Sequence, residues 1–85
     1  MTIDTISPAA QVLAAGEALY GDHWVAPLSS ALGIHGRTLR RLRSAVEAGQ
    51  LYPVAPGVET ALARLLRQRA EVLEAMAAQI EAPAP

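Results

Sequence analysis

Glycines at positions 21, 33, 49 and 57 divide this chain of 85 residues into four segments. Glycine adopts a positive φ without steric cost, so it commonly stands where a helix ends. The apolar residues of the segments follow helical spacing, and no stretch shows the alternation of a strand. The sequence therefore predicts an all-α fold of four helices in one small domain.

Two proline positions define the first half of the chain. Ser7-Pro8 combines an N-cap residue with a proline at the first helical position, which predicts a helix over about residues 8–20. Pro27 fits only in the first turn of a helix, so a second helix is expected over about 25–33. Asp22 is expected to cap that second helix. Residues 1–6 show no pattern and are expected to be flexible.

A third helix is predicted over about residues 36–48, and a connector with two prolines follows it over 51–57. The fourth helix is the longest, over 57–81, and a flexible tail is expected over 82–85. Positions 58, 62, 65, 69, 72 and 76 of this helix alternate steps of four and three, as in a heptad seam.

Arginine supplies every basic residue, and four of the seven fall within seven positions. The rest of the chain holds three arginines against eight acidic residues. One concentrated positive site on an otherwise acidic molecule is typical of a protein that binds a polyanion. The clustered residues are Arg37, Arg40, Arg41 and Arg43.

The spacing around Gly33 predicts a helix-turn-helix over about residues 25–44. This motif needs a glycine in its turn, a small residue where the helices approach, and apolar residues at fixed offsets. Ser29 is the small residue, four positions before the glycine. The apolar positions are Leu28, Leu32, Ile34, Leu39 and Leu42.

The third helix has two faces by this spacing. Leu39, Leu42 and Val46 are expected to face the core. Arg37, Arg40, Arg41 and Ser44 lie on the opposite face, where a recognition helix enters the major groove. Arginine matches the O6 and N7 acceptors of guanine, which indicates half-sites that contain guanine.

Three more residues flank this face. Arg43 and Thr38 are expected to contact phosphate rather than bases. His35 could cap the recognition helix, touch a phosphate or be a plain exposed turn residue.

The chain also resembles a known group of proteins. Its residues 16–24 read GEALYGDHW, 32–34 read LGI and 37–41 read RTLRR, with Leu28 between the first two runs. In these runs it resembles small helix-turn-helix repressors of bacteria and plasmids, and its length and layout are most similar to the KorC repressors of IncP plasmids. The resemblance implies a homodimer that binds a palindromic operator and represses plasmid maintenance genes. It also implies DNA contacts by Arg37, Thr38, Arg40 and Arg41.

The last helix is the surface from which a dimer could be built, because about 37 Å of helix exceeds what three short helices can cover. The alternative is that it folds back across its own domain. A two-fold dimer would read a palindrome with recognition helices about 34 Å apart. Arg69 is expected to pair with Glu71 or Glu74 of the partner. The expected interface residues are Leu62, Leu65, Leu66, Arg69, Val72, Leu73, Met76 and Ile80.

Several function classes are not expected. The chain has no cysteine, and its two histidines, His23 and His35, are far apart without a carboxylate cluster, so no metal or cofactor site is predicted. No catalytic motif or membrane span is evident, and we expect a cytoplasmic protein, not an enzyme, without a small-molecule effector. The alternative function is a helical adaptor or anti-regulator that captures another protein with its last helix.

Overall fold

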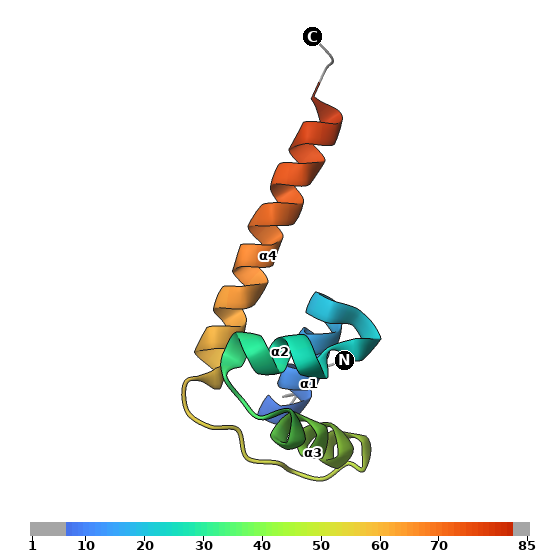
Figure 1. The fold of residues 1–85 in the computed structure, drawn as a ribbon, viewed down its shortest axis with the longest axis vertical. Helices are drawn as coiled ribbons and strands as arrows, with labels where there is room; N and C mark the ends of the chain where they lie inside the picture. Colours follow the sequence, from blue (N-terminus) through green and yellow to red (C-terminus); the bar gives the residue numbers. More distant parts are fainter. Residues whose placement is uncertain (1–6, 83–85) are drawn as a thin grey trace, which may run out of the picture.

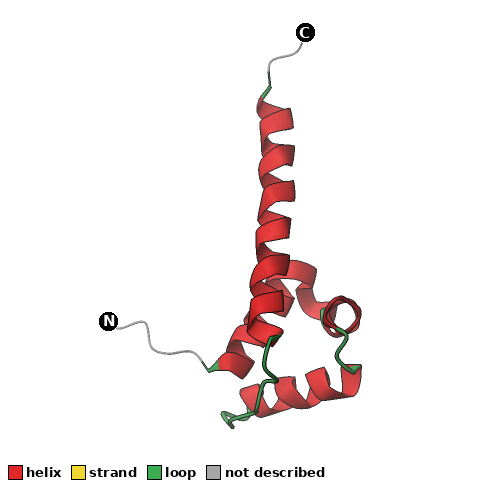
Figure 2. Ribbon diagram, turned by 90° about the vertical axis from the view of Figure 1, so that its left-hand side faces the viewer, coloured by secondary structure: helices red, strands yellow, loops and turns green. Residues whose placement is uncertain are grey.

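The computed structural model describes residues 7–82, and the regular structure in this range is helical (Figures 1 and 2). The predicted all-α fold with a long C-terminal helix is confirmed. The flexible segments expected at 1–6 and 83–85 lie outside the described residues. The elements are α1 (Pro8–Tyr20), the 3₁₀ turn η1 (Gly21–His23), α2 (Val25–Leu32), α3 (Gly36–Glu47) and α4 (Val58–Glu81).

Both ends of α1 form as the sequence predicts. The Ser7 hydroxyl accepts a hydrogen bond from the Ala10 amide at 3.1 Å, and Pro8 stands at the first helical position. Gly21 follows the helix with φ 76°, and its amide donates to the Glu17 carbonyl. These local bonds satisfy backbone groups that a helix end otherwise leaves without partners.

The expected cap of α2 by Asp22 is wrong. Asp22 lies within η1, and this turn moves the N-cap position of α2 to Trp24, whose side chain makes no capping bond. The Trp24 carbonyl accepts the first helical hydrogen bond, from Leu28 at 3.0 Å. The Trp24 indole is instead part of the core, with 1% of its surface exposed.

The core lies where α1, α2 and α3 meet the first turns of α4. Helix α3 packs on both α1 and α2, and α4 also contacts both of these helices. Leu39 and Leu42 are 1% and 4% exposed, which confirms the predicted core face of α3. The buried residues are Ala9, Val12, Ala15, Leu19, Trp24, Leu28, Leu39, Leu42 and Leu62.

Helix α4 leaves the domain after about two turns. All of its residues from Leu66 onward are exposed, and the helix projects alone in both views of the ribbon (Figures 1 and 2). The molecule measures 54 × 36 × 23 Å with a radius of gyration of 15.5 Å. A compact domain of this length would have about 12 Å. The second half of α4 therefore finds no packing partner within the described residues.

This arrangement corrects the residues expected to face a partner. Leu62 is only 5% exposed because it packs in the core of its own chain, and it is not available to a second molecule. Leu65 is half-buried against the same core. The Arg69 guanidinium donates to the Leu19 carbonyl at 3.1 Å, so it binds the C-terminal end of α1 in its own chain.

The large apolar side chains that stay exposed on α4 form what we call the apolar stripe: Leu66, Val72, Leu73, Met76 and Ile80. Their exposed fractions range from 39% at Leu66 to 81% at Ile80. Over the described residues, no helix combines the length and hydropathy that crossing a membrane requires.

Candidate nucleic-acid interface

The turn between α2 and α3 is closed by Ser29. Gly33 ends α2 in the left-handed region, with φ 68° and ψ 30°, and its amide donates to the Ser29 carbonyl at 2.9 Å. The Ile34 amide donates to the same carbonyl at 3.2 Å, and the Ser29 hydroxyl donates to the Ile34 carbonyl. Ser29 thus fixes both strands of the turn.

The small size of Ser29 is evident in the sequence, but its hydroxyl bond to Ile34 was not predicted. The signal was a serine at a position where alanine would satisfy the steric need. A hydroxyl there can bond to backbone that the turn leaves without a helical partner. The bond stabilises the direction in which α3 leaves the turn.

Helix α3 presents one buried and one exposed face, as predicted. The buried face holds Leu39 and Leu42, and Val46 packs against the core at its edge. The four residues that we call the arginine face are all exposed: Arg37, Arg40, Arg41 and Ser44. They follow at intervals of three, one and three residues, which keeps them on one side of the helix.

The flanking residues fall into two groups. Thr38 and His35 are exposed at the beginning of α3. Arg43 is half-buried, and it lines neither of the two grooves described below. The structure therefore separates Arg43 from the other clustered arginines, in agreement with its expected place at the edge of the face.

The N-terminus of α3 has no side-chain cap. His35 occupies the N-cap position with an extended backbone, and its imidazole makes no capping hydrogen bond. Of the roles left open for His35, helix capping is therefore not the one in this structure. Amide groups of the first turn stay available, and the helix dipole makes this end favourable for an anion.

The Arg40 side chain extends back over this same turn. A Cβ placed on Gly36 would lie 3.4 Å from Arg40 Nη1, so the guanidinium lies beside the beginning of the helix. A groove of about 430 Å³ is formed there by His35, Gly36, Arg37, Thr38 and Arg40. It combines two guanidinium groups, a hydroxyl and free helix amides, which are donors suited to a phosphate group.

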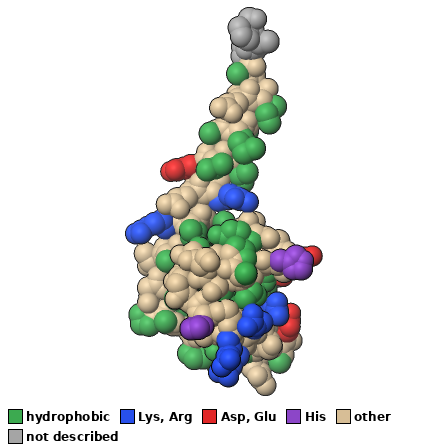
Figure 3. Space-filling view, in the orientation of Figure 1, with side chains coloured by type: hydrophobic (Ala, Val, Ile, Leu, Met, Phe, Trp, Pro, Cys, Tyr) green, Lys and Arg blue, Asp and Glu red, His purple; other side chains and the backbone are tan. Residues whose placement is uncertain are grey.

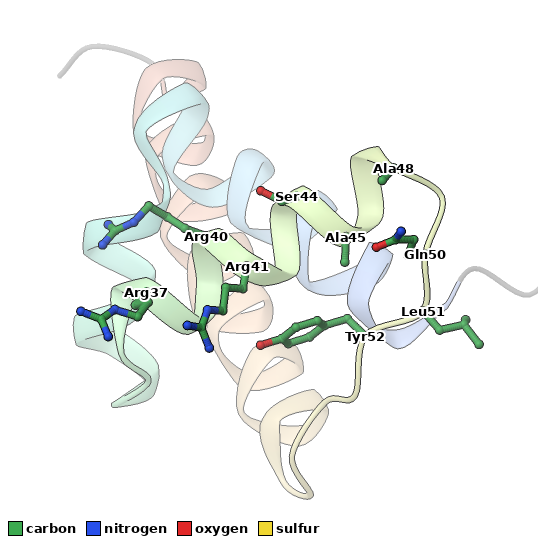
Figure 4. Close-up of a pocket in the computed structure, with 9 residues that line it drawn as sticks. All are labelled: Arg37, Arg40, Arg41, Ser44, Ala45, Ala48, Gln50, Leu51 and Tyr52. Carbon is green, nitrogen blue, oxygen red and sulfur yellow. The ribbon is translucent and has the colours of Figure 1, made fainter.

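A second groove, of about 560 Å³, lies along α3 (Figure 4). The arginine face forms one wall of it, and the residues after α3 form the other. The Tyr52 ring extends beside α3 from the connector. The full lining is Arg37, Arg40, Arg41, Ser44, Ala45, Ala48, Gln50, Leu51 and Tyr52.

Gln50, Leu51 and Tyr52 were not predicted as site residues. The sequence places them in a connector, and their proximity to the arginines follows from the way the chain doubles back after α3 (Figure 4). Leu51 gives the one available signal. It is an apolar residue outside any helical pattern, and it is 90% exposed.

Positive side chains gather over α3 in the space-filling view (Figure 3). Glu47 is the acidic residue of α3, and it stands at the far end of the helix from Arg37. The side-chain hydrogen bonds found within residues 7–82 come from Ser7, Ser29 and Arg69, so the guanidinium groups of the arginine face are not engaged there. In the same range, no group of three or more metal-ligating side chains occurs.

Comparison of the chain with protein-family models, with curated proteins and with solved structures gave no match. The functional assignment therefore depends on the geometry of α2, the turn and α3.

Proposed function

We propose that this protein is a sequence-specific DNA-binding repressor whose α2, turn and α3 act as a helix-turn-helix. In this proposal α3 is the recognition helix and enters the major groove with its arginine face. The major groove of B-DNA is about 12 Å wide, which matches the diameter of an α-helix with its side chains. The domain boundaries proposed for these roles are 7–56 for DNA binding and 57–81 for dimerisation.

One observation carries the proposal: three exposed arginines on the side of α3 opposite its buried leucines. Arg37, Arg40 and Arg41 are exposed, while Leu39 and Leu42 between them are buried. A solvated helix face normally mixes lysine and glutamate, whereas residues 36–46 contain no charge other than arginine. A planar guanidinium can donate two parallel hydrogen bonds to guanine, which gives sequence preference as well as affinity.

The two grooves supply the remaining contacts of a DNA interface. The uncapped turn at Gly36 and the Thr38 hydroxyl would bind a backbone phosphate and set the register of the helix. On the other side, the Tyr52 hydroxyl and the Gln50 amide are placed to contact the opposite backbone. Arg43 would act through its charge rather than through a base contact.

Repression follows from occupancy of a promoter, and the resemblance to plasmid repressors supports this choice. We propose a homodimer, since one recognition helix reads only a few base pairs and two read a palindrome. The proposal involves no cofactor, metal or catalytic residue.

A gel shift with random-sequence DNA at two salt concentrations tests the proposal. The wild type is expected to bind DNA less tightly at the higher salt, because bound arginines displace counterions from phosphate. Replacing Arg43 by Ala should weaken binding to all sequences and reduce the salt dependence. DNA binding that is absent at low salt would contradict the proposal.

The apolar stripe on α4 favours a second candidate, a helical adaptor that captures another protein. An exposed row of large apolar side chains is typical of an interaction surface. The adaptor does not account for the arginine face. An adaptor would also bind DNA no better with Arg37, Arg40 and Arg41 present than with all three replaced, so the same gel shift separates the two functions.

A further inference from the structure

We propose that the apolar stripe binds the α4 helix of a second copy of this chain in antiparallel orientation, with Leu73 beside the two-fold axis. The two domains then lie at opposite ends of the helix pair. The evidence is the direction of the stripe, its symmetry and the distribution of charge along α4.

The stripe faces the same side of α4 as the domain. An α-helix repeats its direction after 18 residues, which is five turns. Leu62 and Ile80 are 18 residues apart, as are Val58 and Met76. Leu62 is buried and Val58 half-buried in the domain, whereas Ile80 and Met76 are exposed. The face that packs on the domain at the root of α4 is therefore the face that is bare further along.

This geometry excludes a parallel pair along α4. Paired helices lie 8–10 Å apart. In a parallel pair the partner's helix would pass the level of Leu62 on the side where α1 and α2 already pack on α4. In an antiparallel pair centred on Leu73, the partner's helix ends, at Glu81, at the level of Leu65. It stops where the domain begins.

The stripe is also self-complementary when reversed. Leu66 and Ile80 lie seven residues on either side of Leu73, so the antiparallel pair brings Leu66 against Ile80 at both ends. Met76 then lies near the aliphatic stem of Arg69. An apolar groove of about 430 Å³ between α1 and α4, with Ala14, Ala18, Ala63 and Leu66 in its lining, continues from this end. It extends the surface that receives the partner's tip.

Charge favours the same orientation. Residues 64–69 contain Arg64, Arg67 and Arg69 without an acid, and residues 71–81 contain Glu71, Glu74 and Glu81 without a base. Antiparallel helices place the basic half of one beside the acidic half of the other, whereas parallel helices place like charges together. Apart from Arg69, these charges lie away from the stripe, so they set the orientation more than the affinity.

The dimer has a consequence for DNA, which rests on the proposed function. From Leu73 to Val58 the helix rises about 22 Å, so the two domains begin about 45 Å apart. This exceeds the single-turn separation of about 34 Å expected from the sequence. The next spacing that presents the same face of DNA is two turns, or roughly 68 Å.

Cysteine cross-linking tests the arrangement, because the chain has no cysteine of its own. Three variants are made, Leu66→Cys, Leu73→Cys and Ile80→Cys, with Ala75→Cys as a control on the opposite face. A short bismaleimide is expected to join Leu73→Cys chains to each other. It should join Leu66→Cys only to Ile80→Cys in a mixture, since identical positions lie about 21 Å apart along the axis.

Each other outcome overturns the proposal. Self-linking of Leu66→Cys or Ile80→Cys would indicate a parallel pair, and a wild-type monomer in sedimentation at tens of micromolar would exclude the dimer. Selected DNA sites with half-sites one turn apart would also contradict it. If no DNA is bound and the cross-link pattern holds, the dimer stands and the proposed function fails.

Discussion

The Trp24 indole lies directly against the backbone of Gly16: a Cβ on Gly16 would be 2.6 Å from Trp24 Cε3 and 2.8 Å from Cδ2. Gly16 stands in the middle of α1, where glycine costs about 1 kcal/mol relative to alanine. The contact explains why this cost is accepted. It lets the chain after α1 turn back so closely that Trp24 is buried, and α2 begins from that anchored residue.

Gly16→Ala is therefore expected to destabilise the protein, although alanine is the better helix former. Overpacking a filled core costs about 1–3 kcal/mol, which exceeds the gain in helix propensity. Urea unfolding should show a net loss of up to about 2 kcal/mol. Gly36→Ala is the matched control, because its Cβ would meet only the flexible end of Arg40. Equal stability of both variants with the wild type would show that Trp24 is not held as described.

The turn before α3 should be sensitive to two changes of different size. Ser29→Ala removes the hydroxyl bond to Ile34 and should cost about 0.5–1.5 kcal/mol. Gly33→Ala forces a side chain into the left-handed region and should cost about 1–2 kcal/mol. Thermal unfolding followed by circular dichroism measures both. A more stable Ser29→Ala variant would contradict the role given to the hydroxyl.

Leu39 tests the packing of α3. Leu39→Ala removes methyl groups from a site that is 1% exposed, and it should destabilise the fold by about 2–5 kcal/mol. Lost helical circular dichroism and lost DNA binding should appear together. Leu51→Ala is a suitable comparison, because Leu51 is 90% exposed and its loss should leave stability unchanged. A fully stable Leu39→Ala protein would show that α3 does not pack on α1 and α2.

Arg69 connects the projecting helix to the domain. Its bond to the Leu19 carbonyl places a positive charge at the C-terminal end of α1, where the helix dipole favours it. Arg69→Gln should therefore reduce stability by about 0.3–1 kcal/mol in low salt, and less in high salt. Arg67→Gln, a change at a nearby exposed arginine of α4, serves as control. An identical loss in both variants would argue against a specific contact.

The helix boundaries could be predicted from the sequence because their causes are local. Ser7, Gly21 and Gly33 each act on neighbours within four residues, and the two faces of α3 follow from helical spacing alone. The reason for Gly16 and the partner of Arg69 could not be predicted, since each depends on residues that only the fold brings together.

The heptad pattern of α4 marks a different limit of sequence analysis. The same spacing continues from buried Leu62 to exposed Ile80 without a change. Periodicity gives the direction of an apolar face but not what covers it. For this reason Leu62 was assigned to an interface although it belongs to the core. The connector after α3 likewise showed no pattern that would place Tyr52 beside the arginines.

The central claim is that the arginine face of α3 reads a DNA sequence. The most direct measurement selects bound sites from random DNA, and then compares wild type with a variant in which Arg37, Arg40 and Arg41 are all Ala. The wild type is expected to enrich one guanine-containing motif and to bind it at least about 10³-fold more tightly than random DNA. The variant should stay folded, because these side chains are exposed, and lose that preference. No enriched motif, or an undiminished preference in the variant, would contradict the account.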